Sequence, residues 1–255
     1  MKITVFGSCS GTEPFPERHQ TAWALEKDGR VYWFDAGEGC AHTAHLMGVD
    51  LLSVSDIFIS HPHMDHVGGL PHLLWCIKKL YTRTKMAPKF GDVTVHAPTK
   101  APFLGAMTML EDSERGAVAP YRVQYAPVTD GELLCADGLT VTARHNLHMK
   151  PTEEGYRSFS FVIDADGRRI VYTGDLASLE ELEALVADGC DALFCETGHH
   201  KPEEICALAK ARGVGHAYFL HHGRYIMQNF DEALAKCRAI FPAVTFCHDR
   251  DVFEI

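Results

Sequence analysis

The chain has 255 residues, 46% of them hydrophobic, which is enough to bury one large core, and we expect a single domain over residues 1–255. Asp and Glu outnumber Lys and Arg by 34 to 24, giving a net charge of −10. That balance argues against strong generic nucleic-acid binding, which relies on Lys and Arg to neutralise phosphates.

The nine cysteines form no C-x-x-C pairs and predict reduced thiols in a cytoplasmic protein. No apolar run reaches the roughly 18 residues of a membrane helix, so no membrane partner is expected.

The first part of the chain predicts three strands and one helix. The opening apolar stretch is too short for a signal peptide and is typical of a strand. Asp28-Gly29 is a hairpin signal between two further strands, and Gly48 ends the helix that follows them. The predicted strands cover residues 1–7, 21–26 and 30–34, and the helix covers residues 41–47.

A cluster of metal-ligand side chains follows the next apolar run, residues 54–60, which predicts a buried strand. His61-Pro62-His63-Met64-Asp65-His66 contains four potential ligands within six residues. His61 and His63 project from the same side of an extended chain, and Pro62 helps to keep it extended. Imidazole and carboxylate groups suit zinc and related ions, so one loop can supply ligands to two adjacent metals.

This H-x-H-x-D-H motif, with Gly68-Gly69 behind it, resembles the signature of the metallo-β-lactamase-fold hydrolases. The order of motifs along the rest of the chain is most similar to the ribonuclease Z and cyclic-phosphodiesterase branch. The resemblance implies an α/β (α+β) fold, a four-layer αββα sandwich with the site at one edge between the sheets. It also implies two divalent metal ions, zinc first, with manganese or iron as alternatives.

The middle of the chain predicts alternating helices and strands. The predicted helices are residues 70–80 and one containing Met107, Met109 and Leu110, and the predicted strands are residues 92–97, 121–128, 138–143 and 158–163. Residues 111–116 are expected to be a charged, exposed link. A basic cluster, residues 78–85 together with Lys89, is either a solvated helix end and loop or a substrate phosphate contact. The chain lacks the long Gly/Pro-rich or basic arm with which full ribonuclease Z grips tRNA, which weakens a tRNA-processing function.

The resemblance supplies the remaining metal ligands. Asp175, in the Thr-Gly-Asp element that ends a predicted strand, corresponds to the aspartate that bridges both metals, because an oxygen shared by two cations must be anionic. His148 is favoured as the third histidine of the first metal, with His145 as the alternative. His221 is favoured for the second metal, with His222 one residue along as the alternative.

Two residues are expected to take part in proton transfer. Asp65 would help to orient a metal-bridging hydroxide and accept its proton, and His199, beside Glu196, would give a proton to the leaving group. Asp35, in an element similar to the family's D-x-G-E-G, is expected to orient a ligand rather than to bind metal. Arg224 could pair with a phosphate or form a surface ion pair.

The sequence therefore predicts a metal-dependent hydrolase that acts on phosphodiesters, either ribonuclease Z-like or on a small cyclic nucleotide. The alternative on the same metal pair is a lactonase or thioester hydrolase, and a scaffold that only binds a ligand is the weakest alternative because the ligand set is intact. The expected partner is a small-molecule or nucleotide phosphoester, and a homodimer is one assembly open to the chain.

Overall fold

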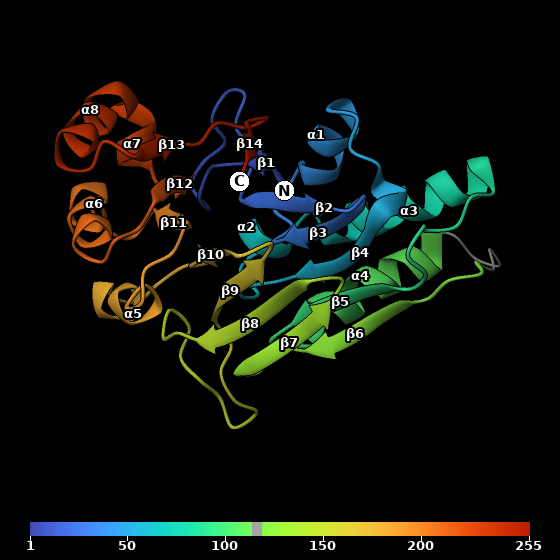
Figure 1. The fold of residues 1–255 in the computed structure, drawn as a ribbon. Coiled ribbons are helices and arrows are strands. Elements are labelled where there is room, and N and C mark those ends of the chain that lie inside the picture. The colour runs from blue at the N-terminus through green and yellow to red at the C-terminus, as the bar shows by residue number, and fades with distance from the viewer. Residues whose placement is uncertain (114–118) are drawn as a thin grey trace. The chain divides into compact units, whose positions relative to one another are not determined.

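The computed structural model describes residues 1–113 and 119–255, and these form two compact units. The first unit comprises Met1–Ser8, Pro16–Pro127 and Asp249–Ile255, and the second comprises Cys9–Phe15 and Val128–His248. Each unit contains one seven-stranded sheet and its own helices (Figure 1). The single domain expected from the sequence stays a prediction.

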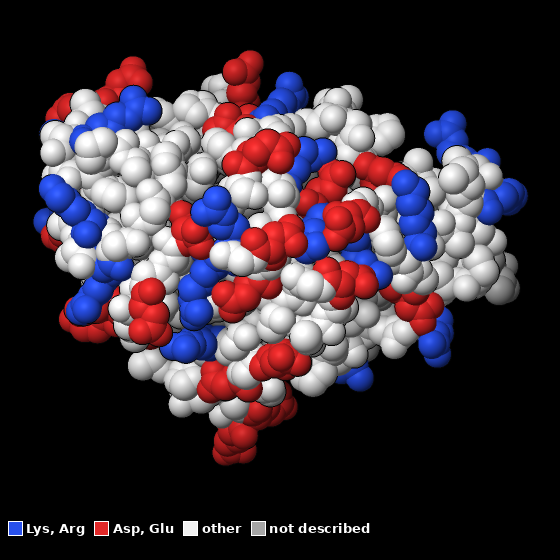
Figure 2. All heavy atoms as spheres, viewed as in Figure 1, with Lys and Arg blue, Asp and Glu red and all other residues white. Residues whose placement is uncertain are grey.

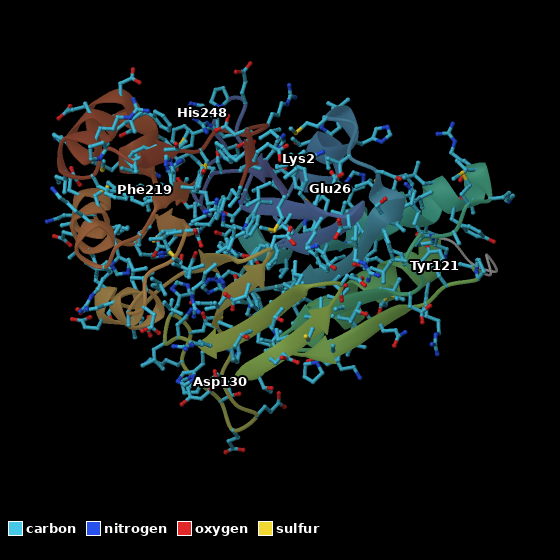
Figure 3. The ribbon with its side chains drawn as sticks, viewed as in Figure 1. Lys2, Glu26, Tyr121, Asp130, Phe219 and His248 are labelled. Atoms are coloured by element: carbon cyan, nitrogen blue, oxygen red, sulfur yellow. The ribbon has the colours of Figure 1, made fainter. Side chains whose placement is uncertain are left out.

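The sheet of the first unit has the strand order β14-β1-β2-β3-β4-β5-β6. Neighbours from β3 to β6 pair in parallel, whereas β14, β1, β2 and β3 pair antiparallel. Lys2 and Glu26 face each other across β1 and β2 and form an ion pair of 2.7 Å (Figure 3). The strands are β1 (Lys2–Gly7), β2 (Ala22–Lys27), β3 (Arg30–Phe34), β4 (Val54–Phe58), β5 (Val93–Ala97), β6 (Val123–Pro127) and β14 (Val252–Glu254).

Helices cover one face of this sheet and bury its apolar side chains. Trp33 and Ile57 from the strands pack in one core with Ala44, Leu73 and Ala106 from the helices, and all five are almost fully buried. The hydrophobic effect of removing these side chains from water holds the helices on the sheet. The helical elements are α1 (Cys40–Leu46), the short 3₁₀ helix η1 (Leu51–Ser53), α2 (Met64–Val67), α3 (Leu70–Thr84) and α4 (Ala101–Ser113).

The sheet of the second unit has the order β13-β12-β11-β10-β9-β8-β7. Strands β10 to β13 run parallel, and β8 runs the same way as β10 because β9 is antiparallel to both. The carboxyl ends of β8, β10, β11 and β12 therefore lie at the same edge of this sheet. The strands are β7 (Gly131–Ala136), β8 (Leu139–His145), β9 (Phe159–Ala165), β10 (Arg168–Tyr172), β11 (Ala192–Thr197), β12 (His216–His222) and β13 (Val244–Phe246).

Four helices of the second unit bury their apolar residues against β9 to β13. Leu182, Ile205, Ile226 and Cys237, one from each helix, share a core with Phe219. The helices are α5 (Leu179–Leu185), α6 (Pro202–Ala211), α7 (Arg224–Gln228) and α8 (Phe230–Ile240), and they form the orange and red part of the ribbon (Figure 1). Two sheets, each with helices, are the two halves that the expected αββα fold requires.

The structure corrects two expectations about the middle of the chain. Helix α4 continues to Ser113, so residues 111–113 are helical rather than a link, and residues 114–116 of that predicted link lie outside the described residues. Strand β7 was not predicted, although Asp137-Gly138 is a hairpin signal and both residues adopt positive φ in the turn to β8. No helix among the described residues is long and apolar enough to cross a membrane.

Candidate metal site

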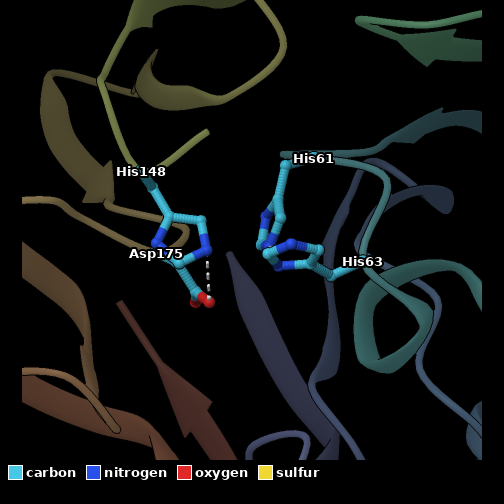
Figure 4. A group of neighbouring side chains, drawn as sticks. All are labelled: His61, His63, His148 and Asp175. Carbon is cyan, nitrogen blue, oxygen red and sulfur yellow. Dashed lines mark hydrogen bonds and ion pairs between the residues drawn. The ribbon is translucent and has the colours of Figure 1, made fainter. Parts of the chain in front are cut away.

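The predicted ligand loop of the first unit runs from the end of β4 into α2. The His61 Nε2 and His63 Nδ1 atoms lie 2.9 Å apart, and the two rings meet edge to face (Figure 4). The ring centroids of His61 and His66 are 4.1 Å apart, and Asp65 Oδ2 lies 3.6 Å from His66 Nε2. His61 and His66 are fully buried, whereas His63 is exposed. The loop thus gathers three imidazoles and a carboxylate within ligand distances.

Asp35, at the end of β3, fixes this loop from the neighbouring strand. Its carboxylate accepts hydrogen bonds from the Ser60 N–H at 2.7 Å and the Ser60 hydroxyl at 2.7 Å, and lies 2.7 Å from His66 Nδ1. The Ser60 hydroxyl also lies 3.0 Å from His61 Nδ1. These contacts use the Nδ1 atoms of both histidines and turn their Nε2 atoms toward the other candidate ligands, His63 and Asp65. They agree with the expected orienting role of Asp35, whose own backbone has φ +52°.

In the second unit, Asp175 is surrounded by three histidines from different strand ends. Its Oδ2 atom lies 3.6 Å from His148 Nε2, a pair drawn in Figure 4, and 3.4 Å from His221 Nε2. It also lies 3.8 Å from His199 Nδ1. Ligand atoms of Asp175, His199 and His221 all fall within 4.8 Å of one another. A buried carboxylate among imidazoles is the donor set that zinc, manganese and iron take, so these residues fit a metal ion.

Each of two histidine alternatives left open by the sequence has a separate structural partner. His145 Nδ1 lies 2.6 Å from Asp130 Oδ2, and its ring stacks on Tyr156. The His222 ring lies 2.8 Å from the Thr197 hydroxyl and 3.0 Å from the Cys247 carbonyl oxygen. These contacts favour His148 and His221 as ligands, because the rings of His145 and His222 already have other partners.

His221 takes its position through an irregularity in β12. It has φ +52°, and the register between β11 and β12 shifts between Glu196 and Thr197. A Cβ atom at Gly198 would lie 2.7 Å from His221 Nδ1, so only glycine leaves room for the ring. The left-handed backbone separates the directions of His221 and His222, which the sequence could not resolve.

Glu196 is a buried carboxylate behind His199 and His221. It accepts hydrogen bonds from the N–H groups of Gly198 at 2.7 Å and His199 at 2.9 Å, and its Oε1 lies 3.3 Å from His199 Nδ1. Burial raises the pKa of Glu196, but the hydrogen bond from His199 and the charges of His221 and His199 outweigh it, so the pKa lies below its ordinary value. An ionised Glu196 holds His199 in orientation toward Asp175.

The remaining sequence candidate, Arg224, lies at the surface. Arg224 forms an exposed ion pair of 2.6 Å with Glu13, as its surface alternative predicted. Sequence reasoning missed Asn146, Glu181 and Ser60, which contact the ligand-bearing segments. Only Glu181 carried a signal, the Ser-x-x-Glu capping box that begins at Ser178.

The chain is similar to proteins of one fold class over its whole length. It is 28% identical to the ribonuclease Z of Shouchella clausii over 305 aligned positions, covering 100% of this chain and 97% of that one. The structure of the short form of human tRNase Z has a TM-score of 0.74 at 18% identity and covers 100% of this chain and 99% of the human one. The metallo-beta-lactamase fold protein YhfI from Bacillus subtilis also has a TM-score of 0.74 at 18% identity, covering 99% and 98% of the two chains.

These similarities confirm the fold class and the enzyme class expected from the sequence: the protein is a metal-dependent hydrolase of the metallo-β-lactamase fold, close to the ribonuclease Z branch. One described protein family also matches residues 1–210 of the chain. The chain belongs to the family described as Anti-Pycsar protein Apyc1.

Proposed function

We propose that the protein is a dinuclear metal-dependent phosphodiesterase. The observation that carries the proposal is the position of Asp175 Oδ2, within 3.4–3.8 Å of nitrogen atoms of His148, His199 and His221. An oxygen in such a place can be shared by two cations. By the family resemblance, the ligands of the two metals are His61, His63, Asp65, His66, His148, Asp175 and His221.

The metal ions, Asp65 and His199 would have separate roles in the reaction. Two bound cations, zinc or alternatively manganese or iron, would lower the pKa of a shared water toward neutrality and offset negative charge on the phosphate. Asp65, which is only partly buried, can orient that water and accept its proton. His199 is less enclosed than Asp175 and is held by Glu196, so it can deliver a proton to the leaving oxygen.

Several features favour a small phosphodiester over tRNA. Figure 2 shows Lys and Arg interspersed with Asp and Glu on the face it presents, and the net charge is −10. The alignment with the Shouchella ribonuclease Z spans 305 positions against 255 residues here, so at least 50 of them have no counterpart in this chain. A shorter, acidic chain has less with which to hold a large polyanion. A cyclic nucleotide is the substrate class that fits best.

The test combines metal analysis with a substrate panel. Wild-type protein should bind about two divalent ions per chain and hydrolyse bis-p-nitrophenyl phosphate and a cyclic mononucleotide faster than precursor tRNA. Asp175→Ala should lose metal and activity together. Asp164→Ala, an exposed carboxylate in β9 of the same sheet, should retain both.

Two outcomes would contradict the proposal. Full metal content in Asp175→Ala would remove Asp175 from the metal site. Hydrolysis of lactones or thioesters without any phosphodiester turnover would instead support the alternative chemistry on the same residues.

A further inference from the structure

Glu181 connects two segments that each carry a proposed metal ligand. Its Oε1 atom accepts a hydrogen bond of 2.7 Å from the Leu147 N–H, 34 residues away in the sequence. Its Oε2 atom accepts hydrogen bonds from Ala177 N–H at 2.8 Å and from Ser178 N–H at 3.4 Å. Leu147 immediately precedes His148, and Ala177 follows Asp175 by two residues.

The hydrogen bond from Leu147 to Glu181 is not part of the helix-capping interaction. A capping box needs Glu181 only to accept from Ser178, the N-cap of α5. Leu147 is 54% exposed, so apolar burial does little to hold this part of the β8–β9 connection. A hydrogen bond from its backbone to a carboxylate is a stronger tether than one to a neutral acceptor.

A second route of hydrogen bonds runs between the same two segments. Asn146 is almost fully buried, and its Oδ1 accepts from the His148 N–H at 3.2 Å and from the Ser158 hydroxyl at 2.5 Å. Its Nδ2 donates to the Ser160 hydroxyl at 3.1 Å, and that hydroxyl donates to the Thr173 carbonyl oxygen at 2.6 Å. Asn146 holds the interior side of the segment, whereas Glu181 holds its exposed side.

We propose that Glu181 is a positioning residue that fixes the separation of His148 and Asp175. The inference rests on the proposed metal site, and it assigns to Glu181 a role apart from its helix. The two carboxylate oxygens act as a clamp, one on each ligand-bearing segment, and hold His148 Nε2 3.6 Å from Asp175 Oδ2. Ligands at a fixed separation bind an ion without first having to be ordered.

The first measurement needs no metal. In metal-free protein, amide hydrogen exchange measured by NMR should be at least about tenfold faster at Leu147 and Ala177 in Glu181→Ala than in wild type. Ser178→Ala is the matched control, because it weakens the cap of the same helix and leaves both contacts of the clamp. It should leave the exchange rate at Leu147 unchanged. Glu181→Gln, which keeps one acceptor oxygen, should fall between Glu181→Ala and wild type.

The second measurement is zinc affinity by competition with a chelator. Glu181→Ala should bind zinc about 10–100-fold more weakly than wild type, the usual effect of removing a residue that orients a ligand, and Ser178→Ala should bind as wild type does. Equal losses in both variants, or unchanged exchange at Leu147, would overturn the clamp. If Asp175→Ala loses zinc while Glu181→Ala does not, only the clamp fails. If Asp175→Ala binds zinc normally, the proposed function fails.

Discussion

The two units build their histidine clusters in opposite ways. In the first unit, His61, His63 and His66 come from one six-residue stretch between β4 and α2. In the second, His148, His199 and His221 follow or end three different strands and meet at Asp175. The first cluster depends on local backbone geometry, and the second depends on the order of strands in the sheet.

The supporting residues differ in the same manner. One carboxylate, Asp35, reaches the loop of the first unit from the adjacent strand β3. The second cluster needs Glu196 behind His199, and Asn146 with Glu181 around His148. A local motif can be stabilised at one point, whereas a dispersed cluster needs support at each strand end. Substitutions at single points should therefore do most harm in the first unit.

Asp35→Ala is expected to give the largest effect. It leaves the buried Ser60 N–H and hydroxyl and the His66 ring without their acceptor, and it places alanine at φ +52°. The metal-free protein should lose about 3 kcal/mol or more of unfolding free energy, because each unpaired buried group costs about 1–3 kcal/mol. Urea denaturation measures the loss. Asp35→Asn tolerates the left-handed backbone and keeps one acceptor oxygen, so it should lose less. A loss of less than about 1 kcal/mol of unfolding free energy in Asp35→Ala would show that other contacts hold the loop.

The difference between the clusters also explains what the sequence could predict. His61 to His66 form a recognisable motif because the spacing alone decides which side chains share a face. The Thr-Gly-Asp element that contains Asp175 could likewise be recognised in the sequence. The separate orientations of His221 and His222 could not be predicted, because they depend on a positive φ at His221 and on Gly198, which follows β11 and has no side chain. Asn146 and Glu181 act through contacts 14 and 34 residues away, which no local pattern encodes.

The neighbouring histidines His221 and His222 test whether the dispersed cluster is assigned correctly. His221→Ala should weaken zinc binding by more than about 100-fold, since even residues that only orient ligands account for about 10–100-fold. His222→Ala should instead lower the unfolding free energy, because its ring contacts the Thr197 hydroxyl and the Cys247 carbonyl oxygen in the core. Chelator competition and urea denaturation separate the two effects. An exchange of these two phenotypes would assign the ligand to His222.

His199 and His200 separate proton transfer from metal binding. His199→Ala should lower kcat on bis-p-nitrophenyl phosphate about 100-fold, the lower range for a lost general acid, with zinc affinity little changed. His200→Ala is the control, because His200 contacts the same Glu196, with its Nε2 3.8 Å from Oε1, and lies 3.1 Å from the Leu176 carbonyl oxygen. With a substrate that has a better leaving group, the difference in kcat between wild type and His199→Ala should be smaller. If zinc affinity falls along with kcat, His199 is a metal ligand instead.

The smallest effect is expected at His145, the alternative to His148. Its ion pair with Asp130 is 37% and 50% exposed on the two side chains, and such pairs contribute about 0–1 kcal/mol. Asp130, labelled in Figure 3, lies in the connection to β7. His145→Ala should therefore keep its zinc affinity and lose at most about 1 kcal/mol of stability, whereas His148→Ala should lose zinc. The His145 ring stacks on Tyr156, and this contact joins the two ends of the β8–β9 connection, which carries His148. If both His145→Ala and Tyr156→Ala lose zinc affinity, the β8–β9 connection needs the stacked pair for support on its exposed side. If only His145→Ala loses zinc affinity, His145 is the ligand.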